Sequence, residues 1–149
     1  MSSVVAASPL EYGPPITLSA AKQVMASAEA AATANHLAVI IAIVDSAAQL
    51  VMLQRLDHAQ FGSIPVAIAK AESAVKFKRP TKIFEEAIAA GGLGLRLLSV
   101  NGVCTIDGGI PLLADGKIVG AIGVAGMTPQ QDAQVAAAGV ARFHARDAT

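Results

Sequence analysis

The sequence predicts one α/β domain built around a mainly antiparallel sheet. Its 149 residues are about the size of a single domain with its own core. Apolar stretches of strand length are joined by short turns, and stretches with helical spacing lie before, between and after them. Strands joined by hairpins run antiparallel, whereas a Rossmann arrangement needs crossovers between parallel strands. These observations together favour the antiparallel class.

The first half of the chain contains a helix, two strands and a second helix. Thr17 can cap a helix in which apolar residues recur every three or four positions over 18–32. Residues 37–44 are short, β-branched and apolar, which is typical of a central strand. Residues 50–56 then pair back as a second strand. A long helix follows over 63–78 and ends before a proline, because the residue preceding proline avoids the helical region.

The next segment, residues 81–106, has a weaker pattern. Thr81 can cap a shorter helix through Ala90, and the glycine-rich residues 91–94 form a link. Residues 95–100 are compatible with either a strand or a helix. Residues 103–106 predict a short strand before the next loop.

The end of the chain carries the strongest local signals. Asp115-Gly116 lies between two apolar runs and predicts a two-residue hairpin turn, because such a turn needs positive φ. Thr128 followed by Gln131 predicts a capping box at the start of a last helix that ends near residue 145. The second hairpin strand has one face of small side chains, which lets another backbone come close; these are Val119, Ala121, Gly123 and Ala125.

Composition excludes several classes of protein. The net charge is zero and aromatic residues are 3% of the chain, so a nucleic-acid partner is not expected. The longest apolar run, over 37–44, is far shorter than the roughly 20 residues that span a bilayer. The single cysteine, Cys104, excludes an internal disulfide. With no signal peptide pattern at the N-terminus, we expect a cytoplasmic protein.

High apolar content in a short chain predicts a homo-oligomer. Hydrophobic residues make up 54% of the sequence, and a small domain of this kind is expected to bury faces against sister subunits. Residues 1–15, with several prolines and small residues, are expected to form a flexible arm, and residues 16–149 the domain.

The order and spacing of several short motifs resemble a known family. Val44-Asp45 ends a strand, Arg55-x-Asp57 ends the next, and the long helix carries KAESA from Lys70. A Pro-Thr helix start, Gly-Gly-x-Pro from Gly108 and the final Asp-Gly hairpin follow. Over residues 16–141 this arrangement is similar to the GlcG/HbpS family, also called haem-degrading or PduO C-terminal-like. Two departures stand out: Ala47-Ala48 replace the usual Gly-Gly, and His58 replaces a usual glycine.

The resemblance implies a five-stranded antiparallel sheet flanked by helices, and assembly into oligomers. It further implies that the protein binds haem or a related tetrapyrrole as its cofactor, in the cytoplasm, and assists haem degradation. The sequence leaves open whether the protein is an enzyme. A small-molecule catabolic enzyme or a binding protein for a carboxylated metabolite is the alternative function, and a purely structural oligomer is a third.

One cluster of candidate site residues lies at the end of the second strand. Arg55 can hold a carboxylate through two hydrogen bonds. Asp57 can orient His58 or cap the following turn, and His58 can act as an acid or base or ligate haem iron. The alternative is a structural Arg55–Asp57 ion pair beside a surface histidine.

A second set of candidates comes from later in the chain. Lys70 can bind an anion, or lie on a solvated helix face. Gly108 and Gly109 can present backbone N–H groups to an anion, or form a simple turn. The resemblance adds Pro111 beside them. Because only a short loop separates the strand of Arg55 from the helix of Lys70, we expect both sets around one pocket.

Overall fold

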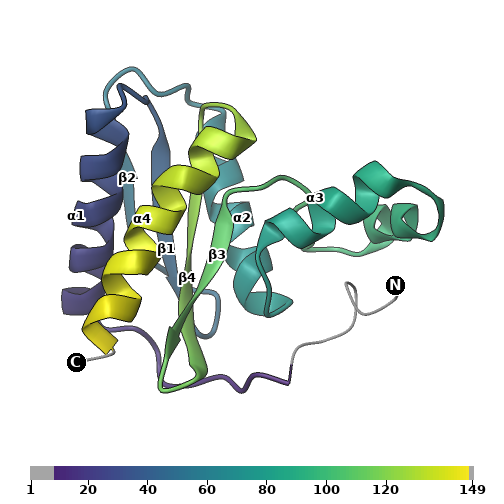
Figure 1. Cartoon of the computed structure of the whole chain (residues 1–149), viewed down its shortest axis with the longest axis horizontal. Coiled ribbons are helices and arrows are strands. Elements are labelled where there is room, and N and C mark those ends of the chain that lie inside the picture. Colours follow the sequence, from purple (N-terminus) through teal and green to yellow (C-terminus); the bar gives the residue numbers. More distant parts are fainter. Residues whose placement is uncertain (1–8, 148–149) are drawn as a thin grey trace.

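The fold is a four-stranded antiparallel sheet with helices on both faces (Figure 1). The computed structural model describes residues 9–147, with side chains as far as residue 144. The elements in chain order are α1 (Leu18–Ala34), β1 (Ile40–Asp45), β2 (Leu50–Arg55), α2 (Ser63–Lys76), α3 (Thr81–Ala90), the 3-10 helix η2 (Gly92–Ser99), β3 (Gly109–Ala114), β4 (Lys117–Ala125) and α4 (Pro129–Asp147).

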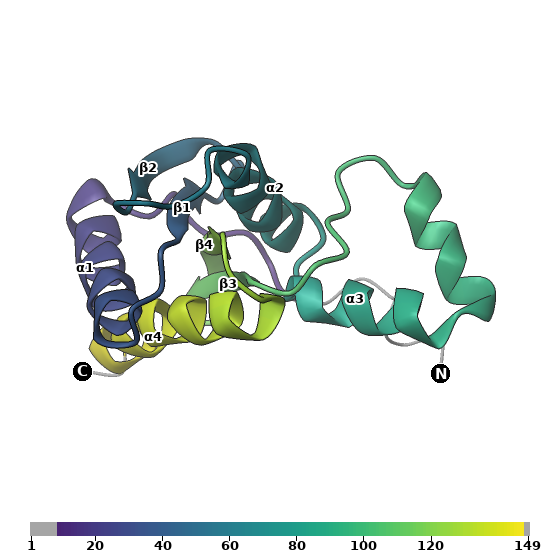
Figure 2. The same ribbon diagram turned by 90° about the horizontal axis from the view of Figure 1, so that it is seen from above.

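The strand order is β2-β1-β4-β3, and every neighbouring pair is antiparallel. Helices α1 and α4 cover one face of the sheet and α2 covers the other (Figure 2). The larger core lies under α1 and α4 and contains Ile41, Ile122 and Val124. The predicted class of α/β domain with an antiparallel sheet is therefore confirmed.

Local signals located most element boundaries. The side chain of Thr17 accepts a hydrogen bond from the backbone N–H of Ala20 (3.1 Å) and caps α1. At the start of α4, the Gln131 N–H donates to Thr128 Oγ1 (3.2 Å) and the Thr128 N–H donates to Gln131 Oε1 (3.2 Å), a complete capping box. Asp115 and Gly116 have φ values of 52° and 73°, as a type I′ hairpin turn requires.

The small face of β4 lets α2 approach the sheet closely. A Cβ on Gly123 would lie 2.1 Å from the Ala67 carbonyl oxygen and 2.6 Å from the Ala71 nitrogen. Ala121 and Ala125 also pack on this side. Val119 does not: it joins the core on the opposite face, next to a register shift in the pairing of β3 with β4.

The expectation of five strands is wrong for the described residues, which form one four-stranded sheet. Residues 103–106 are not a strand. Backbone N–H groups in and just after this segment bond to helix side chains instead. The Cys104 N–H donates to Ser73 Oγ (2.9 Å), and the Asp107 N–H donates to Glu85 Oε1 (3.1 Å). Residues 95–100, which were compatible with strand or helix, lie largely within η2.

The predicted N-terminal arm is partly outside the described residues, because the description begins at residue 9. The part that is described lies against the start of β4. The Ile118 N–H donates to the Glu11 carbonyl (2.9 Å), and the Gly13 and Ile16 N–H groups donate to the Ile118 and Val119 carbonyls (2.8 and 2.9 Å). Pairing with β1 begins only at Gly120, so the edge before it is open to this segment. Residues 11–16 are therefore held in place.

Helices α3 and η2 project from the rest of the molecule as an arm (Figures 1 and 2). In the described part of the chain, no helix has the length and apolar character needed to cross a membrane.

Candidate functional site

Three chain segments meet at one end of the sheet and line an open cavity, where His36, Arg55 and His58 are exposed to solvent. Ile40, which opens β1, pairs with Arg55, which closes β2, so the residues before β1 and after β2 are neighbours. The cavity has a volume of about 860 Å³ and includes the last turns of α1. We call it the histidine cavity; its lining residues are Glu29, Thr33, His36, Leu37, Ala38, Gln54, Arg55, Leu56, Asp57 and His58.

Both histidines of the cavity have a left-handed backbone. His36 has φ 56° and His58 has φ 70°. His36 follows the C-cap of α1, where its N–H donates to the Thr33 carbonyl (3.2 Å) and the Leu37 N–H donates to the Ala32 carbonyl (2.9 Å). This pair of bonds is a Schellman motif, in which glycine is usual. A non-glycine residue in this region costs roughly 1–2 kcal/mol.

The histidine cavity therefore contains two of the three histidines of the chain, each at a position where glycine would be less strained. In the described residues the same left-handed backbone is also found away from the cavity, at Ala48, Lys78 and Asp115.

Gln54 adds an unsatisfied polar atom to the same wall. Its Oε1 is buried and has no hydrogen-bond partner. A buried acceptor without a partner costs about 1–3 kcal/mol, and native structures contain few of them.

Arg55 is exposed, and its guanidinium carbon lies 5.0 Å from the centre of the Phe61 ring. No ion pair joins Arg55 to the neighbouring Asp57, both of which the structure describes. The structural ion pair considered as the alternative for these two residues is therefore absent. The guanidinium remains available to a carboxylate at the cavity mouth.

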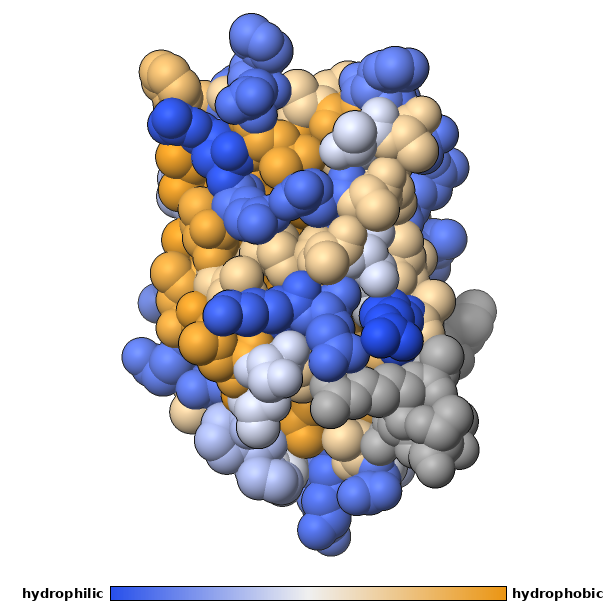
Figure 3. All heavy atoms as spheres, turned by 90° about the vertical axis from the view of Figure 1, so that its left-hand side faces the viewer, coloured by the Kyte–Doolittle hydropathy of each residue, from blue (hydrophilic) through white to orange (hydrophobic). Residues whose placement is uncertain are grey.

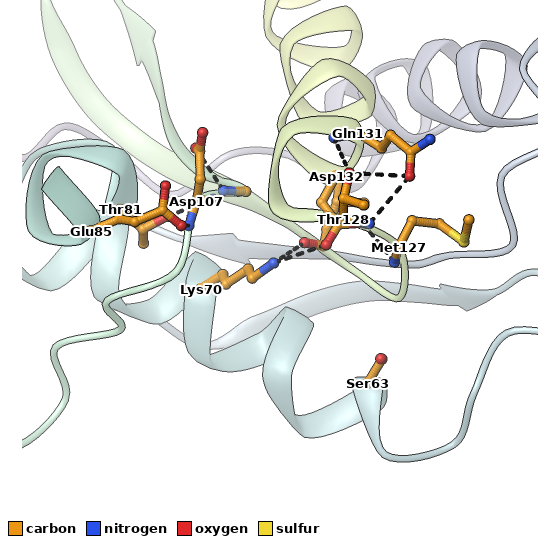
Figure 4. A network of polar contacts seen from close by, with 12 residues as sticks. Ser63, Lys70, Thr81, Glu85, Asp107, Met127, Thr128, Gln131 and Asp132 are labelled. Atoms are coloured by element: carbon orange, nitrogen blue, oxygen red, sulfur yellow. Dashed lines mark hydrogen bonds and ion pairs between the residues drawn. The ribbon is translucent and has the colours of Figure 1, made fainter. Parts of the chain in front are cut away.

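Lys70 lies in a separate buried cluster, which Figure 4 shows in close view. The side chain is almost fully buried, and its Nζ donates to the Val124 carbonyl (2.8 Å) and to Asp132 Oδ2 (3.1 Å). Asp132 Oδ1 in turn accepts the Met127 N–H (3.0 Å). The charge of Lys70 is therefore neutralised inside the protein, and the solvated helix face considered for it is excluded.

The Gly108-Gly109 loop packs directly over Lys70. A Cβ on Gly108 would lie 2.8 Å from Lys70 Nζ, and one on Gly109 would lie 2.3 Å from the Lys70 carbonyl oxygen. The Gly108 N–H donates to Asp107 Oδ1 (2.8 Å) and the Gly109 N–H donates to Thr81 Oγ1 (2.9 Å). Both backbone donors are thus occupied by side chains of the protein.

Asp107 lies in the loop before β3, beside the same two glycines. Burial raises the pKa of Asp107, the hydrogen bond from Gly108 opposes this effect, and the nearby charge of Glu85 adds to it. Pro111 lies buried in β3 opposite Ala121. The cluster of Lys70, Asp107 and Asp132 ties together α2, the loop before β3 and the start of α4.

The expected single pocket is therefore divided. Arg55, Asp57 and His58 line the histidine cavity, whereas Lys70, Gly108, Gly109 and Pro111 are not among its lining residues. The loop before α2 is short, as expected, but Lys70 is seven residues into that helix. A helix rises 1.5 Å per residue, so Lys70 is carried about 10 Å along the sheet to β4.

The sequence interpretation missed His36 and Gln54 as site residues. His36 could have been found from the predicted hairpin, because in an antiparallel pair the residues before the first strand lie beside those after the second. In the described residues, no group of three or more histidine, cysteine or carboxylate side chains is arranged to hold a metal ion.

Comparison with known proteins gives the family. Residues 16–141 match the family described as haem degrading protein HbpS-like. The chain belongs to this family. It is 34% identical to protein GlcG of Escherichia coli strain K12 over 104 residues, which are 70% of this chain and 76% of GlcG.

Solved structures agree with this assignment. The Klebsiella pneumoniae protein ORFY has 31% identity and a TM-score of 0.81, with 94% of this chain and 98% of that chain covered. A complex of PduOC with haem has 25% identity and a TM-score of 0.77, with 86% and 94% covered. The predicted resemblance to the GlcG/HbpS family is confirmed.

Proposed function

We propose that this protein binds haem, or a closely related tetrapyrrole, in the histidine cavity. The observation that carries the proposal is that His36 and His58 line the same cavity, each with a left-handed backbone. Histidine is a common axial ligand of haem iron. A volume of about 860 Å³ lies in the upper part of the range for small-molecule and cofactor sites.

The other lining residues fit the same ligand. Arg55 at the mouth would pair with a haem propionate, because a guanidinium binds a carboxylate through two hydrogen bonds. Leu37 and Leu56 offer apolar contact to the macrocycle. Asp57, the neighbour of His58, would accept a ring N–H and so fix the tautomer of the ligating imidazole. Bound haem would supply the redox chemistry that degradation requires, and these residues would hold and orient it.

Haem titration tests the proposal directly. Haemin is added to the wild type and to His36→Ala, His58→Ala and His144→Ala, and the Soret band is followed. His144 is the matched control, because it is the third histidine of the chain and does not line the cavity. We expect saturation at one haem per chain for the wild type and the control, and a weakened or shifted Soret band for the cavity variants. Identical titrations for all four proteins would contradict the proposal.

A carboxylated metabolite is the second candidate ligand, and the exposed guanidinium of Arg55 favours it. In that case His58 would act as the acid or base and Asp57 would orient it, while Lys70 would take no part because Asp132 neutralises it. Arg55→Ala should weaken such a ligand by roughly 1.5–3 kcal/mol. Calorimetric titration with small mono- and dicarboxylates, with the haem-free protein, separates this candidate from haem.

Self-association is part of the same proposal. Large apolar side chains remain exposed on the described surface, among them Leu18 and Leu50, each 52% exposed. Figure 3, which views the molecule from the side of α1, shows apolar surface running between polar side chains. Monomeric proteins rarely leave extended apolar patches in water. We expect light scattering to give a homo-oligomer at micromolar concentration, and a monomer would contradict this expectation.

A further inference from the structure

The arm formed by α3, η2 and the chain that returns from them, residues 81–106, is the most apolar exposed part of the structure. Five of the ten exposed large apolar residues in the described chain lie between 93 and 106: Leu93, Leu95, Leu98, Val100 and Ile106. Arg96 is the only charged residue in that stretch. An arm that leaves the body with this surface lacks a partner within its own chain.

The tip of the arm presents Leu93, the most exposed of several exposed leucines in η2. The turn between α3 and η2 is the far end of the arm in Figures 1 and 2. Leu93 in this turn is 78% exposed, the most exposed large apolar residue of the described chain. Gly91 and Gly92 precede it, and a Cβ on either would have nothing within 4 Å. Leu93 is therefore a knob standing clear of its surroundings.

The base of the arm contains an apolar hollow of about 250 Å³. Phe77 and Phe84, which contact each other edge to face at 5.9 Å, form part of its wall, together with Leu97, Val100 and Val103. Lys76, Lys78 and Arg79 complete the lining. We call this hollow the arm socket. Its apolar wall and its volume suit one or two aliphatic side chains.

Charge is complementary between the tip and the socket. The tip holds the C-terminus of α3, whose last turn contains no basic residue, so its free carbonyls carry a partial negative charge. The socket has three cationic side chains, of which Lys76 is already paired with Glu72 (3.3 Å). Lys78 donates to the Leu10 carbonyl and lies over the Tyr12 ring, and neither contact neutralises its charge. A helix C-terminus is stabilised beside such cations.

We infer that two copies of this chain pair through their arms, with Leu93 of each inserted in the arm socket of the other. This inference rests on the proposed self-association and names its surface. Every chain has one knob and one socket, so a two-fold axis satisfies both at once, as an isologous interface requires. Helix α3 has 10 residues and spans about 15 Å, so antiparallel arms bring each tip to the opposite base.

Charge insertion at the knob tests the pairing. Leu93→Lys is compared with Met127→Lys, which places the same charge at an exposed apolar residue just before α4, away from the arm. Because Leu93 is 78% exposed in one chain, its replacement should leave the monomer fold intact. By light scattering we expect Leu93→Lys to have half the mass of the wild type and Met127→Lys to keep the wild-type mass. An unchanged mass for Leu93→Lys would overturn the inference.

Disulfide trapping tests the partner of the knob. In a Cys104→Ser background, Leu93→Cys is combined with Val100→Cys. These positions are separated by seven residues of 3-10 helix, about 14 Å, which is beyond the 7 Å limit between Cα atoms for a disulfide. Only a bond between two chains can form. We expect a covalent dimer from the double variant under mild oxidation and little from either single variant.

Efficient cross-linking by Leu93→Cys alone would show that tips meet each other, and no cross-link in the double variant would show that tip and socket do not meet. Either result overturns the inference. Haemin binding by Leu93→Lys shows whether the proposed haem site is intact, independently of whether the arms pair. The histidine cavity contains no residue of the arm, so its titration should match that of the wild type.

Discussion

Replacing His58 by glycine should stabilise the fold and weaken haem binding in the same variant. His58 has φ 70°, where a non-glycine residue costs roughly 1–2 kcal/mol. Glycine removes that cost, but its greater conformational entropy in the unfolded chain lowers the free energy of unfolding by about 0.4–1 kcal/mol. The free energy of unfolding should therefore rise by about 0.5–1 kcal/mol. For a chain of this size that corresponds to an increase in Tm of roughly 1–4 °C.

The haem side of this prediction has the opposite sign. The proposal makes His58 an iron ligand or the partner of one, so its loss should raise the Kd for haemin at least tenfold. Thermal unfolding of the haem-free protein and haemin titration are both measured on His58→Gly and the wild type. A variant that gains stability while its affinity is unchanged would refute the reasoning that strain at His58 is retained for binding.

Ala48→Gly is the matched control. Ala48 also has a left-handed backbone, φ 63°, and lies in the turn between β1 and β2, outside the histidine cavity. It is only 8% exposed, so losing its methyl costs up to about 0.8 kcal/mol and offsets much of the relief of strain. We expect little change in Tm and none in haemin affinity. A loss of affinity in this control would show that the effect at His58 is not local.

Three further predictions concern the fold and the buried cluster. Gly123→Ala should lower the free energy of unfolding by more than about 2 kcal/mol, because its Cβ would meet the backbone of α2 at 2.1 Å. Gly62→Ala, which has open space around it, should change the free energy of unfolding by less than about 1 kcal/mol. Equal effects of the two variants in urea unfolding would disprove close packing at Gly123. Lys70→Met should cost about 3–5 kcal/mol, since it leaves Asp132 buried without its cation, and a smaller loss would show that the pair is dispensable. Burial raises the pKa of Asp107 above its ordinary value of 3.8, so the protonated carboxyl contributes fully to stability below pH 3.8, and this contribution declines as the pH rises through the higher native pKa. Asp107→Asn should therefore be more stable than the wild type at pH 7 but not at pH 3. The same difference in the free energy of unfolding by urea at both pH values would contradict this.

Local signals in the sequence predicted the parts of the fold that depend on neighbouring residues. Thr17, Thr128 and Asp115-Gly116 act over a few positions, and each is found in its expected role. The segment 103–106 was predicted wrongly as a strand because its environment is set by Ser73 and Glu85, which are distant in sequence. Apolar composition alone does not reveal partners of that kind.

For the candidate site too, the sequence revealed neighbours along the chain but not contacts between distant residues. Arg55, Asp57 and His58 are adjacent in sequence and line one cavity together. His36 joins them only through the pairing of β1 with β2, and Asp132 reaches Lys70 across 62 positions. The buried role of Lys70 could not be foreseen from its helix, because its counter-ion lies at the start of α4. Long-range pairing of charged groups requires the fold to be known.

A crystal structure of the haem-loaded protein tests the central claim most directly. We expect iron bound by the imidazole of His36 or His58 at the histidine cavity, with a propionate at Arg55. Iron held by any other side chain, or haem bound elsewhere on the molecule with both histidines unengaged, would contradict it.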